Sequence, residues 1–163
     1  MKERCVSLVV KSLIRGSRIK VSPDTTVDKV WKLLARRDIT LVPVVDEKNT
    51  LVGVIGEDDI LYLLVPDYRE YFSEFFPISP DLEDLEEKLE KELILKASDV
   101  MNREVVYIHE DQPVFKALSR MMIHRIRALP VLDTEEKYAG IIYEDDIMQY
   151  LFDKHKHLVK KRK

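Results

Sequence analysis

The sequence has little cysteine, little glycine and no long apolar run: its 163 residues include one cysteine, Cys5, and four glycines. A single cysteine excludes an internal disulfide, a four-thiolate zinc site and a Cys-x-x-Cys redox pair. No stretch approaches the roughly 18 uncharged apolar residues of a membrane span, and the apolar run near the start is too short for a signal peptide. We therefore expect a cytoplasmic protein with no membrane partner.

An excess of basic charge is also absent. Lys and Arg number 27 against 30 Asp and Glu, which gives a formal net charge of −3. That balance excludes an overall basic field directed at nucleic acid, so a nucleic-acid partner is not expected. The chain does contain 45% apolar and 35% charged residues. These shares suit a packed core with a solvated surface, in one domain or two small ones.

The chain repeats itself. The segment LVPVVDEKNTLVGVIGEDDILYLL, from Leu41, aligns without a gap on ALPVLDTEEKYAGIIYEDDIMQYL, from Ala128, at a constant offset of 87 residues. Upstream, both copies carry apolar residues at the i, i+3, i+4, i+7, i+8 spacing of an amphipathic helix. The fold is therefore expected to contain one structural unit used twice.

Each copy is predicted to fold as strand, helix, strand, turn, strand, helix, because continuous β-branched and Leu runs favour buried strands. The elements expected in the first copy are Arg18–Val21, Thr26–Arg37, Leu41–Val45, Leu51–Ile55 and a helix from Glu57 to about Val65. Those in the second are Val105–Ile108, Val114–His124, Ala128–Leu132, Tyr138–Ile142 and Glu144–Phe152. One copy is too small for a comfortable core, so we expect an α+β fold in which two copies pack about a pseudo-twofold axis.

These motifs resemble a tandem pair of CBS domains, also called a Bateman module. The matching pieces are Val42-Pro43-Val44-Val45-Asp46 with Leu129-Pro130-Val131-Leu132-Asp133, and the glycine turns Gly53 to Asp59 with Gly140 to Asp146. The resemblance implies two β-α-β-β-α repeats, no catalysis and usually a homodimer. It also implies an adenosine-type ligand (AMP, ADP, ATP or S-adenosylmethionine) in clefts between the repeats.

The resemblance assigns binding residues to two clefts. One joins Gly56, Asp58 and Asp59 to Ile126, Arg127, Ala128 and Pro130; the other joins Tyr143, Asp145 and Asp146 to Ile39, Thr40, Leu41 and Pro43. Chemically, a carboxylate at Asp59 or Asp146 can accept hydrogen bonds from both hydroxyls of a ribose. Acids in the first turn of a helix are also common for helix-dipole and capping reasons alone, which is the competing explanation.

The sequence departs from the family pattern at both turns. The usual Ser or Thr is replaced by Gly56 and Tyr143, and an acid precedes each ribose-binding Asp. Adjacent carboxylates repel a phosphate unless a cation compensates. Arg127 can do so in the first cleft, whereas its counterpart Thr40 cannot in the second, so the Asp59 cleft is the better candidate. A phosphate-free adenosine, a Mg²⁺-bridged nucleotide and an empty cleft stay open as alternatives.

The rest of the chain divides into accessory segments. We predict repeats at 1–65 and 96–153, a helical insert at 66–95 and a basic tail at 154–163. The insert has an aromatic stripe and then a leucine seam: Tyr68, Tyr71, Phe72, Phe75 and Phe76, followed by Leu82, Leu85, Leu89 and Leu93. It suits a dimer-stabilising arm, a docking surface or a lid over the chain's own core. The last ten residues carry six basic residues and no acid, which suits either a partner contact or a solubilising tail.

Two functions remain open. The first is a stand-alone sensor that binds an adenosine-type ligand and signals in trans to an unknown target protein. The second is a dimeric interaction scaffold with vestigial clefts, which contacts a protein or nucleic acid through its insert and tail. No Walker loop, G-x-G-x-x-G or Ser/His/Asp order is present, so no enzyme activity is expected. His109 and His124 lie in different predicted elements without a Cys or paired partner, so no metal site is expected either.

Overall fold

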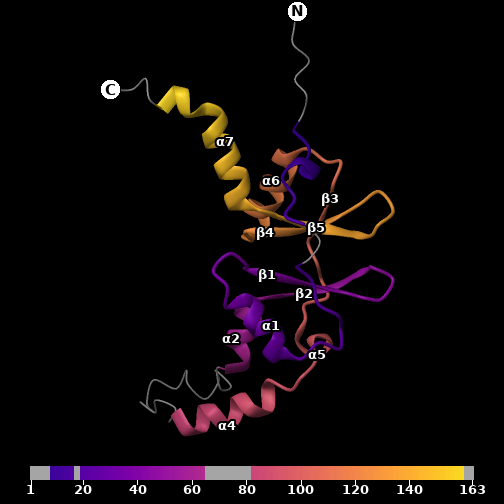
Figure 1. Cartoon of the computed structure of the whole chain (residues 1–163), viewed down its shortest axis with the longest axis vertical. Helices are drawn as coiled ribbons and strands as arrows, with labels where there is room; N and C mark the ends of the chain where they lie inside the picture. Colours follow the sequence, from indigo (N-terminus) through magenta and orange to yellow (C-terminus); the bar gives the residue numbers. More distant parts are fainter. Residues whose placement is uncertain (1–7, 17–18, 65–81, 160–163) are drawn as a thin grey trace, which may run out of the picture. The chain divides into compact units, whose positions relative to one another are not determined.

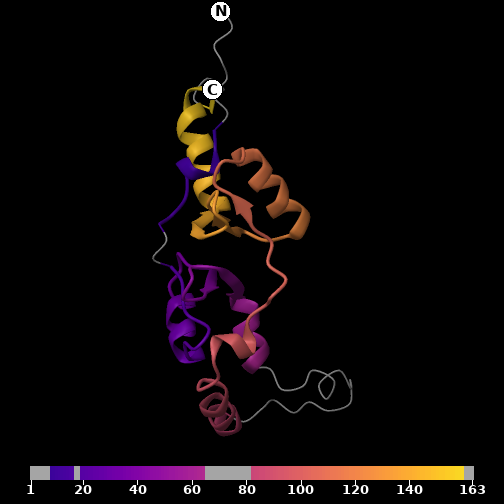
Figure 2. The same cartoon turned by 90° about the vertical axis from the view of Figure 1, so that its right-hand side faces the viewer.

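The computed structural model describes residues 8–16, 19–64 and 82–159. The chain divides into two compact units: Lys20–Val105 is one, and Met1–Ile19 together with Val106–Lys163 is the other. Each unit combines helices with a small sheet of its own (Figures 1 and 2). The expected α+β class is therefore confirmed.

The Lys20–Val105 unit is built on one antiparallel pair of strands, β1 (Leu41–Val45) and β2 (Leu51–Gly56). Helices α1 (Val27–Leu34) and α2 (Glu57–Leu64) lie on one side of these strands (Figure 1). Two more helices follow in the chain, α4 (Leu82–Glu92) and α5 (Ala97–Val100). The core consists of buried apolar side chains from all of these except α4: Val27, Val30, Leu34, Ile39, Val42, Val44, Val45, Ile55, Ile60 and Ala97.

The second unit has a three-stranded sheet in the order β3-β4-β5. Its elements are the 3₁₀ turn η1 (Val10–Ser12), β3 (Ile108–His109), α6 (Val114–His124), β4 (Ala128–Leu132), β5 (Tyr138–Tyr143) and α7 (Glu144–Val159). β3 pairs with β4 in parallel, and β4 pairs with β5 antiparallel. One buried cluster joins these elements: Val10, Ile108, Val114, Ala117, Met121, Leu129, Val131, Ile142 and Ile147.

Each repeat is completed by a segment from outside it. Arg15 and Ile141 exchange two backbone hydrogen bonds, of 2.9 and 3.3 Å, and Asn102 and Val54 exchange two of 2.9 and 3.0 Å. Arg15 and Asn102 are 87 residues apart, so the repeat extends upstream into both segments. The residues at the start of each predicted repeat therefore pack in the compact unit of the other repeat, so the units do not coincide with the divisions predicted at residues 65 and 96.

Two glycines at equivalent positions make room for these segments. A Cβ on Gly53 would lie 2.5 Å from the sulfur of Met101. A Cβ on Gly140 would lie 2.5 Å from the carbonyl oxygen of Arg15, and Gly140 also has a φ of +154°, which L-residues rarely adopt. The glycine of each motif is thus required by the close approach of the added segment.

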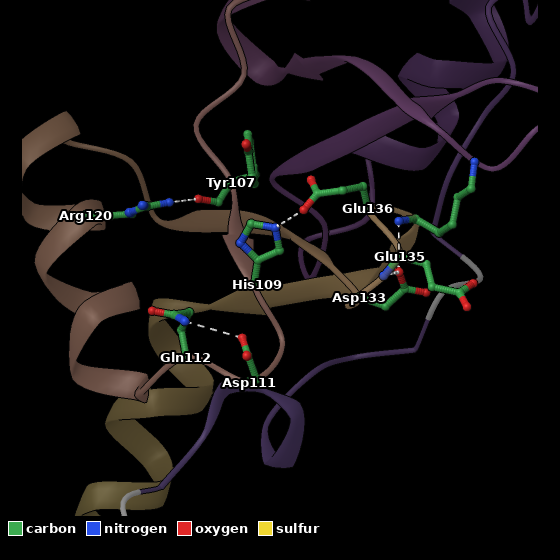
Figure 3. Close-up of polar contacts among 9 residues, drawn as sticks. Tyr107, His109, Asp111, Gln112, Arg120, Asp133, Glu135 and Glu136 are labelled. Carbon is green, nitrogen blue, oxygen red and sulfur yellow. Dashed lines mark hydrogen bonds and ion pairs between the residues drawn. The ribbon is translucent and has the colours of Figure 1, made fainter.

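The turns between paired strands are organised by aspartates. Asp46 and Asp133 each accept two backbone N–H hydrogen bonds within their own turn, at 2.8–2.9 Å. The last residue of each turn is left-handed, Asn49 with a φ of 61° and Glu136 with a φ of 61°. The carboxylate of Glu136 lies 2.6 Å from Nε2 of His109 on β3 (Figure 3). Asn tolerates this conformation better than Glu does, so the second turn is the more strained of the two.

Several predicted boundaries were wrong. Among the described residues of the predicted strand Arg18–Val21, only Val21 pairs, in a single bridge to Val44, because the chain then turns at Ser22, whose N–H donates to Thr25 Oγ1. The predicted strand Val105–Ile108 likewise reduces to β3. α1 is shorter than the predicted Thr26–Arg37, since the helix tightens at its end into a bond from Arg36 N–H to the Leu33 carbonyl.

The insert and the tail have partial descriptions. The predicted aromatic stripe at 68–76 lies outside the described residues, whereas α4 contains three residues of the predicted leucine seam, Leu82, Leu85 and Leu89, and ends before the fourth, Leu93. The chain after α4 anchors α1: the N–H groups of Val27 and Asp28 donate to the carbonyls of Leu95 and Leu93 at 2.8 and 3.1 Å. α7 continues to Val159 instead of ending at Phe152, so much of the predicted tail is helical. No helix within the described residues is long and apolar enough to span a membrane.

Candidate ligand sites at two strand-to-helix turns

Each repeat ends its second long strand in a turn that starts a helix. The first three residues of α2 are Glu57, Asp58 and Asp59, and those of α7 are Glu144, Asp145 and Asp146. Strand pairing places Leu41 opposite Gly56 and Ala128 opposite Tyr143. The N-terminus of α2 therefore lies beside the start of β1, and the N-terminus of α7 lies beside the start of β4.

The predicted site residues divide into buried and accessible groups. Ile39, Pro43, Ala128, Pro130 and Tyr143 are buried. The accessible or partly accessible ones are Thr40, Leu41, Gly56, Asp58, Asp59, Ile126, Arg127, Asp145 and Asp146. The predicted pairing of each turn with a strand of the other repeat joins two separate compact units and stays a prediction.

Asp59 caps its own helix. Its Oδ2 accepts a hydrogen bond of 2.7 Å from the backbone N–H of Gly56, three residues earlier. This is the arrangement in which the third residue of a helix satisfies the N–H just before the first turn. Within the described part of the chain, the other oxygen, Oδ1, has no hydrogen bond. Capping therefore accounts for one carboxylate oxygen and leaves the second available to a ligand.

Asp146, at the equivalent position, is held differently. Arg15 donates from Nε to Oδ2 and from Nη2 to Oδ1, both at 2.8 Å. The side chains are only partly exposed, 39% for Arg15 and 25% for Asp146. The guanidinium carbon of Arg15 also lies 4.7 Å from the ring centroid of Tyr143, in a cation–π contact. Both oxygens of this carboxylate are thus engaged by one arginine.

Arg127 binds the acids of its own turn. Its Nε lies 3.2 Å from Glu144 Oε2, and its Nη2 lies 3.0 Å from Asp145 Oδ1. The hydrogen bond to Glu144 is the largest cause of a raised pKa for this guanidinium. The backbone joins the same residues, because the N–H of Glu144 donates to the Arg127 carbonyl at 2.9 Å. Arg127 thereby neutralises acids at the start of α7, whereas the sequence suggested compensation at Asp59.

The sequence prediction missed Arg15. Arg15 lies 131 residues from Asp146, and no motif joins the two. The available signal was the offset of 87 residues, which relates Arg15 to Asn102 and gives both residues equivalent places upstream of the predicted elements of their repeats. The same comparison shows that the two repeats differ in charge at this position.

A second feature absent from the prediction is an open hollow of about 250 Å³ beside α1 and α2. Its lining is mostly apolar and includes one carboxylate: Trp31, Leu34, Ala35, Glu57, Ile60 and Leu61. Such a lining suits an apolar side chain better than a nucleotide. Among the described residues, no group of three or more His, Cys, Asp or Glu side chains is arranged to hold a metal ion.

The chain is similar in sequence to a protein family and to several known proteins. The family described as "CBS domain" matches residues 10–66 and 97–153. A CBS domain-containing protein of Dictyostelium discoideum is 32% identical over 146 residues, which cover 90% of this chain and 92% of that protein. The inosine-5′-monophosphate dehydrogenase of Methanocaldococcus jannaschii is 30% identical over 131 residues, 80% of this chain but only 21% of the enzyme.

Solved structures show the same fold. CBSX2 in complex with AMP has a TM-score of 0.66 at 23% identity, over 90% of this chain and 97% of that one. The CBS domain pair of protein MJ0100, in complex with 5′-methylthioadenosine and S-adenosyl-L-methionine, has a TM-score of 0.64 at 24% identity, again over 90% and 97%.

Proposed function

Because this chain belongs to the CBS-domain family and carries the domain twice, we propose that it is a regulatory module that binds an adenosine-type ligand and signals to a partner protein. The role is binding, with no chemical step. Two structural neighbours were solved with AMP or with S-adenosyl-L-methionine, which supports ligands of this class. Within the chain, the proposal rests on Asp59, which uses one carboxylate oxygen to cap its helix and has the other oxygen left for a ligand.

Asp59 offers what a ribose requires. Its Oδ2 is fixed by the Gly56 N–H, which orients the carboxylate, and its Oδ1 can accept a hydroxyl hydrogen bond. Gly56 adds space: a Cβ there would lie 3.7 Å from Asp59 Oδ2 and 3.8 Å from the Thr40 carbonyl oxygen. Without that Cβ, a sugar can approach the backbone at the N-terminus of α2. We propose Asp59 as the ribose acceptor of the functional site.

The test is a thermal-shift series with AMP, ADP, ATP and S-adenosylmethionine, with and without Mg²⁺. A ligand present at 100 times its Kd should stabilise the protein by about 2.7 kcal/mol. Asp59→Asn should abolish the shift, because its single carbonyl oxygen is needed by the Gly56 N–H and only an amide donor then faces the ligand. The Mg²⁺ arm separates a cation-bridged nucleotide from one bound without a cation.

A matched control exists in the same unit. Asp99, the third residue of α5, accepts the backbone N–H of Lys96 at 2.9 Å, as Asp59 does for Gly56. Asp99→Asn changes the same kind of cap at another helix, so it should leave the ligand shift intact. A loss of the shift in both variants would mean that capping, and not ligand contact, explains the result. No shift with any of the four ligands would remove the support for a sensor.

We also propose that a second copy of the chain covers the exposed apolar side chains of α6 and α7. They include Phe115, Met122, Ile123, Met148 and Phe152, which are 52–74% exposed. Such side chains are unfavourable in water, and the hollow beside α1 offers a further apolar surface. In analytical ultracentrifugation the wild type should sediment as a dimer and Met122→Glu as a monomer. His124→Glu, on the opposite side of α6, should stay dimeric; a monomeric wild type would contradict the proposal.

The alternative function is a dimeric scaffold with vestigial sites. It is favoured by the second turn, where Arg15 engages Asp146 and the ring of Tyr143 is buried. A protein that dimerises but responds to no adenosine-type ligand would support the scaffold. A ligand shift that depends on Asp59 would contradict it.

A further inference from the structure

The equivalent carboxylates of the two repeats have different hydrogen-bond partners. Asp146 has both oxygens hydrogen-bonded to Arg15, each at 2.8 Å. Asp59 uses Oδ2 for the Gly56 N–H and has Oδ1 left for a ligand. The difference originates outside the turns, in the segment that pairs with β5 or β2.

The position that decides this difference holds Arg15 in one segment and Asn102 in the other. Both residues exchange backbone hydrogen bonds with the adjacent strand, with Ile141 and Val54 respectively, so their main chains are equivalent. Their side chains are not equivalent: Asn102 is neutral, and its Oδ1 accepts the backbone N–H of Glu104 at 2.9 Å. Among the residues that the structure describes, the second repeat therefore has a cation bonded to the carboxylate of its turn and the first repeat has none.

A ribose that binds Asp146 has to displace this arginine. The two bonds are charge-assisted and parallel, and the partly buried position limits screening by solvent. The cation–π contact with Tyr143 adds a further attraction that holds the guanidinium in place. Two neutral hydroxyl donors replace such a pair unfavourably, because the partly buried carboxylate then loses its counter-ion and its bidentate partner.

We propose that Arg15 is the residue that restricts ligand binding to one repeat: it occupies Asp146 and, of these two equivalent carboxylates, leaves Asp59 open to a ribose. This inference rests on the proposed function, because it assigns the nucleoside to one of the two equivalent turns. It makes Arg15 a specificity-determining residue that acts through Asp146. The chain then takes one nucleoside and not two.

The experiment is isothermal titration calorimetry with adenosine, whose lack of charge removes any direct attraction between Arg15 and a phosphate. The wild type should bind one adenosine per chain. Arg15→Asn, which copies the first repeat, should bind a second adenosine with an affinity at least about tenfold higher than that of the same turn in the wild type. Arg15→Asn combined with Asp146→Asn should return to one. Lys11→Asn is the matched control, because Lys11 lies in the same segment and pairs with Glu110 at 3.1 Å.

The reciprocal exchange tests the same claim from the other repeat. Asn102→Arg places a cation at the equivalent position beside α2 and should weaken adenosine binding at Asp59 by about tenfold or more. AMP provides a further arm: if Arg15→Asn weakens AMP binding at the second turn, Arg15 is a phosphate ligand and the proposal is overturned. The proposal is also overturned if the wild type binds two adenosines or if Arg15→Asn gains none.

The outcomes separate this inference from the proposed function. A wild type that binds one adenosine through Asp59, with no gain in Arg15→Asn, contradicts only the role of Arg15. A wild type that binds none, with one adenosine per chain in Arg15→Asn, contradicts binding at Asp59 and supports the role of Arg15. Absence of binding in both proteins overturns both.

Discussion

Replacing Gly140 with alanine should destabilise the unit that contains residues 8–16 and 106–159 by about 2–6 kcal/mol. Gly140 has a φ of +154°, and an added Cβ would lie 2.5 Å from the carbonyl oxygen of Arg15. That oxygen is part of the backbone and accepts the Ile141 N–H at 3.3 Å, so it cannot move aside without loss of this bond. The same displacement would carry Arg15 away from Asp146.

The magnitude has two sources. Forcing an L-residue into this backbone conformation costs about 1–3 kcal/mol. Moving packed neighbours to admit a methyl group costs about 1–3 kcal/mol more. Gly53→Ala meets only the second cost, because Gly53 has no unusual φ and its neighbour is the flexible side chain of Met101. Gly140→Ala should therefore be the more destabilising of the two by about 1–3 kcal/mol.

The two units can be observed separately. Hydrogen exchange of the β5 amides reports the unit of Gly140, and fluorescence of Trp31, the single tryptophan, reports the unit of Gly53 during urea unfolding. Gly16→Ala is the control, since a Cβ there meets nothing within 4 Å and should change stability by no more than about 0.5 kcal/mol. A Gly140→Ala protein as stable as Gly16→Ala, or more stable than Gly53→Ala, would refute the reasoning.

Three further variants test other contacts. Burial raises the pKa of Tyr138, so the folded state keeps the neutral phenol and the free energy of unfolding should fall by about 1.4 kcal/mol per pH unit above about pH 10. Melting curves of Tyr138→Phe should lose this slope and show a cost of about 1 kcal/mol for the missing bond to the Ile19 carbonyl. Asp59→Ala should lose about 1 kcal/mol of cap energy in urea unfolding, and an unchanged midpoint would contradict the Gly56 contact. Glu136→Asn should melt at a higher temperature than Glu136→Ala, which loses the same contact with His109, through about 0.5–1 kcal/mol of relieved left-handed strain; an equal or lower melting temperature would contradict it.

The main elements could be predicted because the hydrophobic pattern is local. Strands Leu41–Val45 and Ala128–Leu132 and helix Val114–His124 agree with the structure at both ends. Each of these elements contains its own apolar run or helical periodicity, and the second repeat shows the same pattern again. Short strands such as β3 could not be bounded in this way, since their pairing depends on a partner strand far along the chain.

The segments that complete each repeat could not be assigned from sequence. Apolar residues such as Ile14 and Met101 were visible, but hydrophobicity does not specify which sheet they join. The contacts at Gly140 and Gly53 resolve this in three dimensions. The motif glycines were recognised from the sequence, whereas the reason for their presence is the neighbouring segment.

The candidate site was predicted in part. The positions of Asp59 and Asp146 in the first turn of a helix follow directly from the motif and are observed. Their partners were not predictable, because a capping bond and a bidentate arginine are consistent with the same local sequence. Within its own unit Arg127 contacts the acids next to Asp146, which the sequence did not indicate; its assignment to the Asp59 cleft stays a prediction.

The central claim, that Asp59 accepts the ribose of an adenosine-type ligand, is tested most directly by a crystal structure of the chain grown with AMP. The account predicts ribose hydroxyls within hydrogen-bond distance of the Asp59 carboxylate, while Arg15 still binds both oxygens of Asp146. AMP with its ribose on Asp146, or AMP bound away from both carboxylates, would contradict it.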